Sequence, residues 1–157
     1  MSRARTTSKI IGTPAIWDNK QTFDTLMKVQ QSLEKITITA AAPTATTHFD
    51  WASQAVQYYT TACTVNWTLN LRGNASTSID SLMAVDECIT FTLMVTMTGS
   101  PYYASAMTVD GNSVTPKWIG GTAPSSGDAS CINIYTYTVI KTGAAAFTVI
   151  ASKAKTS

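Results

Sequence analysis

The sequence predicts an all-β fold, an antiparallel β-sandwich of jelly-roll type, preceded by an N-terminal arm and one helix. Threonine and serine account for 27 and 15 of the 157 residues, and charged residues for only 13%, a composition that favours strands with hydroxyl-covered surfaces. Long segments alternate between apolar and polar residues. Turns rich in Gly, Pro and Asp separate these segments. A chain of this length forms one ordinary domain plus a short extension.

The first 35 residues differ from the rest in charge and pattern. They carry six basic residues against three acidic ones, whereas residues 36–152 carry three against six. We predict a basic arm up to about residue 12 and a helix over 15–34, because Pro14 suits a first helical turn and Asp18 begins a capping-box pattern. The apolar spacing of this helix fits a short coiled-coil seam or a helix packed on its own or a neighbouring domain. We therefore divide the chain into a docking or oligomerisation segment, 1–35, and a β-sandwich domain, 36–157.

The β domain begins where the apolar pattern changes to a period of two. The alternation is clear in residues 64–72 and 88–98, and a strand with one buried face requires it. Further strands are predicted at 36–39, 54–60, 103–109, 131–141 and 145–152, and one helical turn within 78–84. The predicted core consists of Trp67, Leu69, Leu71, Phe91, Leu93, Val95, Ile134, Val149 and Ile150. The three cysteines, which have no CxxC spacing, are expected to be small buried side chains: Cys63, Cys88 and Cys131.

Residues 113–130 form a long predicted loop with two prolines and three glycines. Such a loop in a compact domain is usually functional or flexible. Two interpretations stay open: the loop contributes a binding surface, or Trp118 plugs the end of the domain and the loop is a crossover. Aromatic side chains suit contacts with sugars or proteins. The residues proposed for such surface contacts are Tyr59, Tyr103 and Trp118, although burial of all the aromatic residues is the alternative.

The residues offer little for catalysis or metal binding. His48 is the only histidine and Asp50 could orient it, but no nucleophile motif accompanies them. We expect no enzyme activity, no cofactor and no metal site. The acidic balance of residues 36–152 argues against nucleic acid as a partner. The longest apolar runs are a few residues, far short of the roughly 20 that span a bilayer, and residues 1–12 lack the pattern of a secretion signal.

A resemblance covers about residues 54–155. It rests on five segments in order: YYTTACTVNWTLNLRGN (58–74), SLMAVDECITFTLMVT (81–96), YYASAMTVDG (102–111), VTPKWIGGTAPSSGDAS (114–130) and INIYTYTVIKTGAAAFTVIAS (132–152). This series resembles a β domain of virion structural proteins of cyanophages, where it is similar to the C-terminal domain of tail-fibre-like proteins and to short stand-alone proteins. The resemblance implies a non-enzymatic particle component. Residues 1–50 depart from it, because they lack the repetitive shaft of a complete fibre.

Four functions follow in order of preference. The first is a tail-associated or fibre-like appendage, homotrimeric, located in the virion and contacting other tail, baseplate or capsid proteins and a host-surface glycan. The second is a capsid decoration protein that clamps shell subunits. A carbohydrate-binding module is third, and a hydrolase using His48 is fourth. For attachment to the particle we expect charge and apolar anchors to combine, with the docking residues Arg3, Arg5, Lys9, Ile10, Ile11, Trp17 and Phe23.

Overall fold

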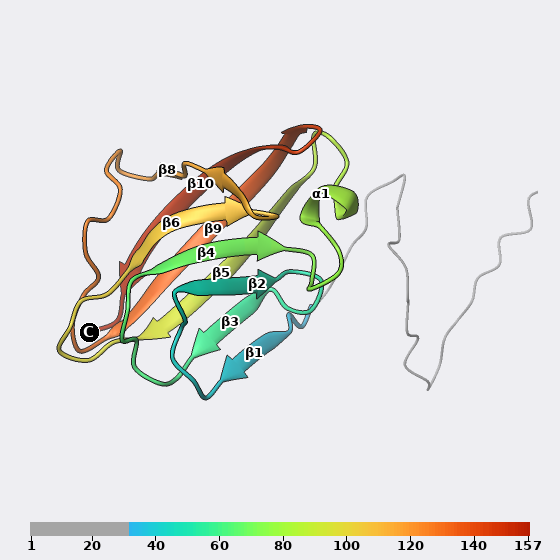
Figure 1. The fold of residues 1–157 in the computed structure, drawn as a ribbon. Coiled ribbons are helices and arrows are strands. Elements are labelled where there is room, and N and C mark those ends of the chain that lie inside the picture. Colours follow the sequence, from blue (N-terminus) through green and yellow to red (C-terminus); the bar gives the residue numbers. More distant parts are fainter. Residues whose placement is uncertain (1–31) are drawn as a thin grey trace, which may run out of the picture. The chain divides into compact units, whose positions relative to one another are not determined.

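The computed structural model describes residues 32–157. The predicted docking residues and nearly all of the predicted helix 15–34 lie outside this range; residues 32–34, at its end, are not helical. Residues Leu33–Ser157 belong to one unit, which is mostly β and consists of two sheets and one short helix (Figure 1). In residues 32–157 no helix is long and apolar enough to cross a membrane.

Ten strands form the two sheets. The six-stranded sheet has the order β1 (Ile36–Thr39), β3 (Val56–Tyr59), β5 (Cys88–Thr96), β9 (Ile132–Gly143), β10 (Ala146–Lys155) and β8 (Lys117–Trp118). The four-stranded sheet has the order β2 (Thr46–Asp50), β4 (Trp67–Arg72), β6 (Ala104–Val109) and β7 (Asn112–Val114). The helix, α1 (Ile79–Leu82), lies in the connection between β4 and β5.

The prediction of purely antiparallel pairing is wrong. Five of the eight strand pairs are parallel, including β1 with β3, β3 with β5, β2 with β4 and β4 with β6. The reason is that the chain changes sheet after each of its first strands, so that β1, β3 and β5 enter one sheet and β2, β4 and β6 the other. Strands that neighbour each other are then two apart in sequence and run in the same direction. Antiparallel pairs remain at β6–β7, β5–β9 and the long hairpin β9–β10.

One hydrophobic core lies between the two sheets. Phe49 on β2 contacts Phe91 on β5 with ring centroids 4.3 Å apart, and Trp67 on β4 meets Tyr135 on β9 edge-on at 5.8 Å. Edge-to-face and offset ring pairs of this kind stabilise a core beyond the area that they bury. Seven of the nine predicted core residues are buried: Trp67, Leu69, Leu71, Phe91, Leu93, Val95 and Val149.

Two predicted core residues, Ile134 and Ile150, face outward instead. Ile150 is 37% exposed, and Ile134 is only half-buried. In β9 the inward positions belong to Tyr135, Tyr137 and Val139, which are all buried. Side chains alternate along a strand, so burial of the larger tyrosines places the isoleucines on the opposite face. Of the cysteines, Cys63 is buried as predicted, whereas Cys88 is exposed and Cys131 half-buried.

Most strand positions agree with the sequence predictions, and the exceptions are short or polar. The helical turn predicted within 78–84 is α1. Strand β2 was not predicted. The predicted loop 113–130 contains the end of β7 and the two-residue strand β8, so the loop is partly tied to both sheets.

A buried lysine fastens α1 to the six-stranded sheet. Lys141 on β9 is 7% exposed, and its Nζ forms an ion pair with Asp80 Oδ1 at 2.8 Å. The same ammonium group donates hydrogen bonds to the backbone carbonyls of Asp80 (2.6 Å) and Met83 (2.9 Å). All three donors of the ammonium are thereby used, as a buried charge requires. The hydrogen bond from Lys141 and that from the Ala145 N–H lower the pKa of Asp80.

Candidate binding surfaces

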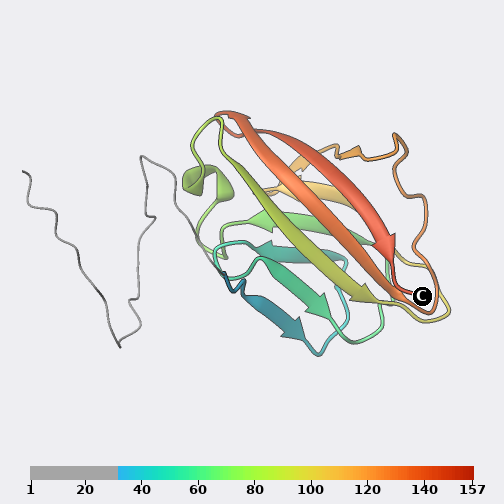
Figure 2. The ribbon, with the colours of Figure 1, turned by 180° about the vertical axis from the view of Figure 1, so that it is seen from behind.

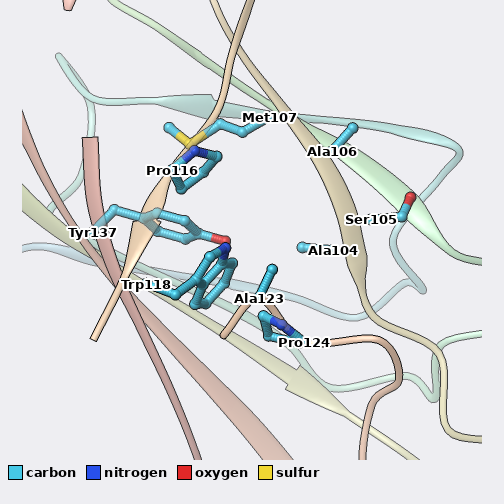
Figure 3. A pocket seen from close by; sticks show the side chains of 9 residues that line it. All are labelled: Ala104, Ser105, Ala106, Met107, Pro116, Trp118, Ala123, Pro124 and Tyr137. Atoms are coloured by element: carbon cyan, nitrogen blue, oxygen red, sulfur yellow. The ribbon is translucent and has the colours of Figure 1, made fainter. Parts of the chain in front are cut away.

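Trp118 lies beside two hollows at the β8 edge of the six-stranded sheet. A cavity of about 50 Å³ is bounded by Trp118, Tyr137, Met107 and the two prolines of the 113–130 segment (Figure 3). A wider and more open hollow of about 350 Å³ shares Trp118, Ala123 and Pro124 with it. Typical small-ligand sites occupy roughly 300–1,000 Å³. Of these two hollows, the open one is therefore large enough for a sugar ring or a peptide side chain.

Two features hold Trp118 and the loop beside it in place. The indole packs edge-on against the rings of Tyr135 and Tyr137, at 6.5 and 6.2 Å between centroids. The loop approaches the chain closely at Gly127, whose N–H donates to the Pro101 carbonyl at 2.7 Å, and a Cβ at this glycine would collide with the Tyr102 carbonyl. Trp118 thus packs against the core from the edge strand β8 and also lines a hollow.

The rim of the open hollow is polar and charged. Thr122, Ser125, Ser126 and Lys153 line it together with Trp118. The Lys153 ammonium pairs with Asp128 at 2.6 Å, and Lys155 approaches the same carboxylate at 3.2 Å. The hydrogen bond from Lys153 is the main cause of the lowered pKa of Asp128. Two ammonium groups against one carboxylate leave a net positive charge beside the hollow.

The other two predicted contact residues lie elsewhere. Tyr59 packs against the core, its hydroxyl accepts a hydrogen bond from Gln57 Nε2 at 2.8 Å, and burial raises its pKa. The side chain of its neighbour Tyr58 lies on the outer face of the sheet instead. Tyr103 is half-buried and its backbone N–H donates to Asn66 Oδ1 at 3.1 Å. Neither tyrosine lines the two Trp118 hollows, so the three residues do not form one site.

The outer face of the four-stranded sheet is polar and internally hydrogen-bonded. Asn70 contacts His48 Nδ1 at 3.0 Å, and its Oδ1 accepts hydrogen bonds from the Thr108 hydroxyl at 2.7 Å and the Gly111 N–H at 2.9 Å. Asp50 pairs with Arg72 at 2.6 Å. His48 and Asp50 are thus each bound to a different partner, and the proposed catalytic pair of the hydrolase hypothesis is not formed in this structure.

The outer face of the six-stranded sheet has a different character. Along β1, β3, β5, β9 and β10, no outward side chain is charged. We call this surface the uncharged face; its central residues are Val56, Tyr58, Thr92, Met94, Ile134, Thr136, Thr138 and Ile150. In the view from behind, no described element lies over β5, β9 and β10 (Figure 2). Lys117 on the edge strand β8 pairs with Ile150 and lies at the border of this face.

Sequence reasoning missed the uncharged face, although a signal for it was present. The alternation in 88–98 predicts the buried side chains of that strand. Its complementary positions, and the positions of 132–140 that pair with them, hold only Thr, Met, Ile and Cys, where Lys and Glu are common on a solvated strand face. The absence of charge at these outward positions was the observation that could have identified the surface.

No protein-family model, curated protein or solved structure matches this chain. Among the residues that the structure describes, no group of three or more His, Cys, Asp and Glu side chains could hold a metal ion.

Proposed function

We propose that the protein is a non-enzymatic structural component of a bacteriophage virion, a tail-associated or fibre-like appendage. Residues 1–35 anchor it to the particle, and the β domain projects from there. The body is a β-sandwich whose two facing sheets are like those of a jelly roll. Its strand directions differ from the purely antiparallel ones of a jelly roll. The sequence resemblance over about 54–155 supports the assignment to a virion.

The observation that carries the proposal is the contrast between the two outer sheet faces. The face of the four-stranded sheet holds charged and hydrogen-bonded groups that suit contact with water. The uncharged face exposes Ile36, Ile38 and Ile150. Large exposed surfaces with few charges mark contacts with other proteins. A protein with one solvated side and one side suited to burial fits a subunit of an assembly.

The N-terminal anchor is tested in phage particles that carry a truncated gene. Deletion of residues 1–35 is expected to leave a folded β domain that is lost from purified particles, because both the basic and the apolar anchors are removed. Changing only Arg3, Arg5 and Lys9 to alanine should weaken incorporation more gradually and mainly near or below about 0.15 M salt, where screening is incomplete. Quantitative mass spectrometry of particles measures the copy number.

A truncated domain that still joins particles at the normal copy number would contradict the N-terminal anchor. The β body would then be the attachment element, and the capsid decoration role, with the body clamped on the shell, would replace the appendage role. Absence of the full-length protein from purified particles would contradict the virion assignment itself.

A second proposal concerns a sugar ligand, favoured by the open hollow with Trp118 on one side and hydroxyl groups and Lys153 on its rim. Stacking on an aromatic ring together with hydrogen bonds suits a pyranose, and the net positive charge favours an acidic sugar. Trp118→Ala is expected to reduce binding of an acidic oligosaccharide at least tenfold in a titration followed by NMR. The control is Tyr103→Ala, which changes an aromatic residue away from the hollow. Equal affinity of the Trp118 and Tyr103 variants would contradict the site.

A further inference from the structure

The uncharged face has an ordered apolar row across it. Register places Ile38, Tyr58, Met94, Ile134 and Ala154 side by side on five neighbouring strands. Ile38 is 63% exposed at the edge of the row, and Ile36 on the same strand is 46% exposed. Cross-strand neighbours on one face lie about 5 Å apart and form a continuous surface. The row therefore offers an apolar strip that burial would stabilise.

The hydroxyl groups of this face are partly paired with one another. The Thr90 and Thr138 hydroxyls lie 3.2 Å apart, and the Thr96 hydroxyl donates to the Tyr58 hydroxyl at 3.3 Å. Covering a polar group is costly when it loses its hydrogen bond to water. Because these hydroxyls already have partners within the face, covering them costs less than covering isolated hydroxyls would.

The size of the face suits a specific protein contact. At about 4.8 Å per strand and 3.4 Å per residue, the long strands β5, β9 and β10, with 9, 12 and 10 residues, contribute about 500 Å². The four-residue strands β1 and β3 add about 130 Å². The resulting plane is about 600 Å², close to the roughly 800 Å² that each partner buries in a standard interface.

We propose that this face is covered by a second copy of the chain, which gives a two-fold pair rather than the homotrimer expected from the sequence. An occupant must be broad and must not bury unpaired charges, because the face has no charged group to pair with them. Within the described residues, the surface with these properties is the uncharged face itself, so that two copies match each other in area and polarity. Lys117, at the border of the face, stays at the solvated rim. This deepens the proposed function by naming the partner.

The test compares the oligomeric state of the full chain with that of two double variants. Met94→Lys with Thr138→Lys places two ammonium groups on the face without setting them directly opposite each other. The control, Thr46→Lys with Ala106→Lys, adds the same charge on exposed outward positions of the four-stranded sheet. Sedimentation velocity between about 1 and 100 µM measures the mass. We expect the wild type and the control to be oligomers in this range. The dissociation constant of the face variant should be at least 100-fold higher than that of the wild type.

Cys88 gives a second measurement on the unmodified protein. It is exposed on this face of β5, and its labelling by a maleimide should slow at least tenfold from the monomer to the oligomer. A folded face variant that keeps the oligomeric mass, a wild type that is monomeric at 100 µM, or an oligomer with unchanged Cys88 labelling would each overturn the contact. If the face variant does not fold, the rates of Cys88 labelling in the wild type test the contact instead. A monomer that still joins particles overturns this inference alone, whereas an oligomer that is absent from particles overturns the proposed function alone.

Discussion

Replacing Phe91 with alanine is expected to lower the free energy of unfolding by about 3–5 kcal/mol, the range for buried Phe truncations. Phe91 is 1% exposed, and its ring lies between Phe49 of the opposite sheet, at 4.3 Å, and Tyr137 of its own sheet, at 5.1 Å between centroids. The truncation would remove a ring that joins the two sheets and leave a cavity between them. Urea denaturation followed by fluorescence measures the loss.

The matched control is Thr92→Ala, one residue further along the same strand. Thr92 faces outward, so the change should cost less than about 1 kcal/mol. Similar losses for both variants would mean that the assignment of inward and outward faces in β5 is incorrect.

Replacing Lys141 with alanine should be the second most damaging change, lowering the free energy of unfolding by about 2–4 kcal/mol. Hydrogen bonds to charged groups are individually worth about 1.5–3 kcal/mol, and the Lys141 side chain that donates them is 9% exposed, whereas the Asp80 side chain is 35% exposed. The variant would lose the ion pair with Asp80 and leave the Asp80 and Met83 carbonyls without their ammonium donor. Detachment of α1 should follow, and hydrogen exchange of the amides around α1 would detect it.

The control is Lys155→Ala, which removes another paired lysine. Its side chain is 60% exposed, and exposed ion pairs contribute about 0–1 kcal/mol. The two variants should also differ in their pH dependence. Because the folded state lowers the pKa of Asp80, the pair stabilises the protein above the unfolded-state pKa and loses this contribution as the pH falls through the folded-state pKa.

Wild type should therefore lose more stability than Lys141→Ala when the pH falls through this acidic range. An equal pH dependence in the two proteins, or an unfolding free energy of Lys141→Ala matching that of Lys155→Ala, would contradict the role given to the buried lysine.

The strands that could be predicted are those in which one face is apolar and the other is not. Residues 67–72 and 88–96 satisfy this condition, and their buried faces were assigned correctly. Strand β2 could not be predicted in this way because its inward positions are Thr47 and Phe49, so that it has only one apolar residue on the buried face. In β9 both faces carry apolar residues, and periodicity alone could not show that Tyr135 and Tyr137 rather than Ile134 point inward. Strand direction was beyond prediction, because alternation does not reveal the sheet that a strand joins.

The candidate surfaces were predictable only where a single residue dominates them. Trp118 stood out by its type and by the loop that contains it, and it does line a hollow. Tyr59 and Tyr103 were chosen for the same reason, but their surroundings depend on strand register. The uncharged face is a property of five strands together, and only their pairing shows that its residues are neighbours.

The alternation of the first strands between the two sheets also determines when each sheet can be completed during synthesis. Strands β1 and β3 leave the ribosome before β5, and β5 must wait for β9, about 40 residues later, before its other edge is paired. The local hairpin β9–β10 is therefore made after the other strands of the six-stranded sheet, and it joins β5 to the edge strand β8. Until then β5 has an unpaired edge that could recruit a strand from another nascent chain. Non-local pairing of this kind is also slow to form, so nascent chains on neighbouring ribosomes of one messenger would expose such edges to each other for a longer time.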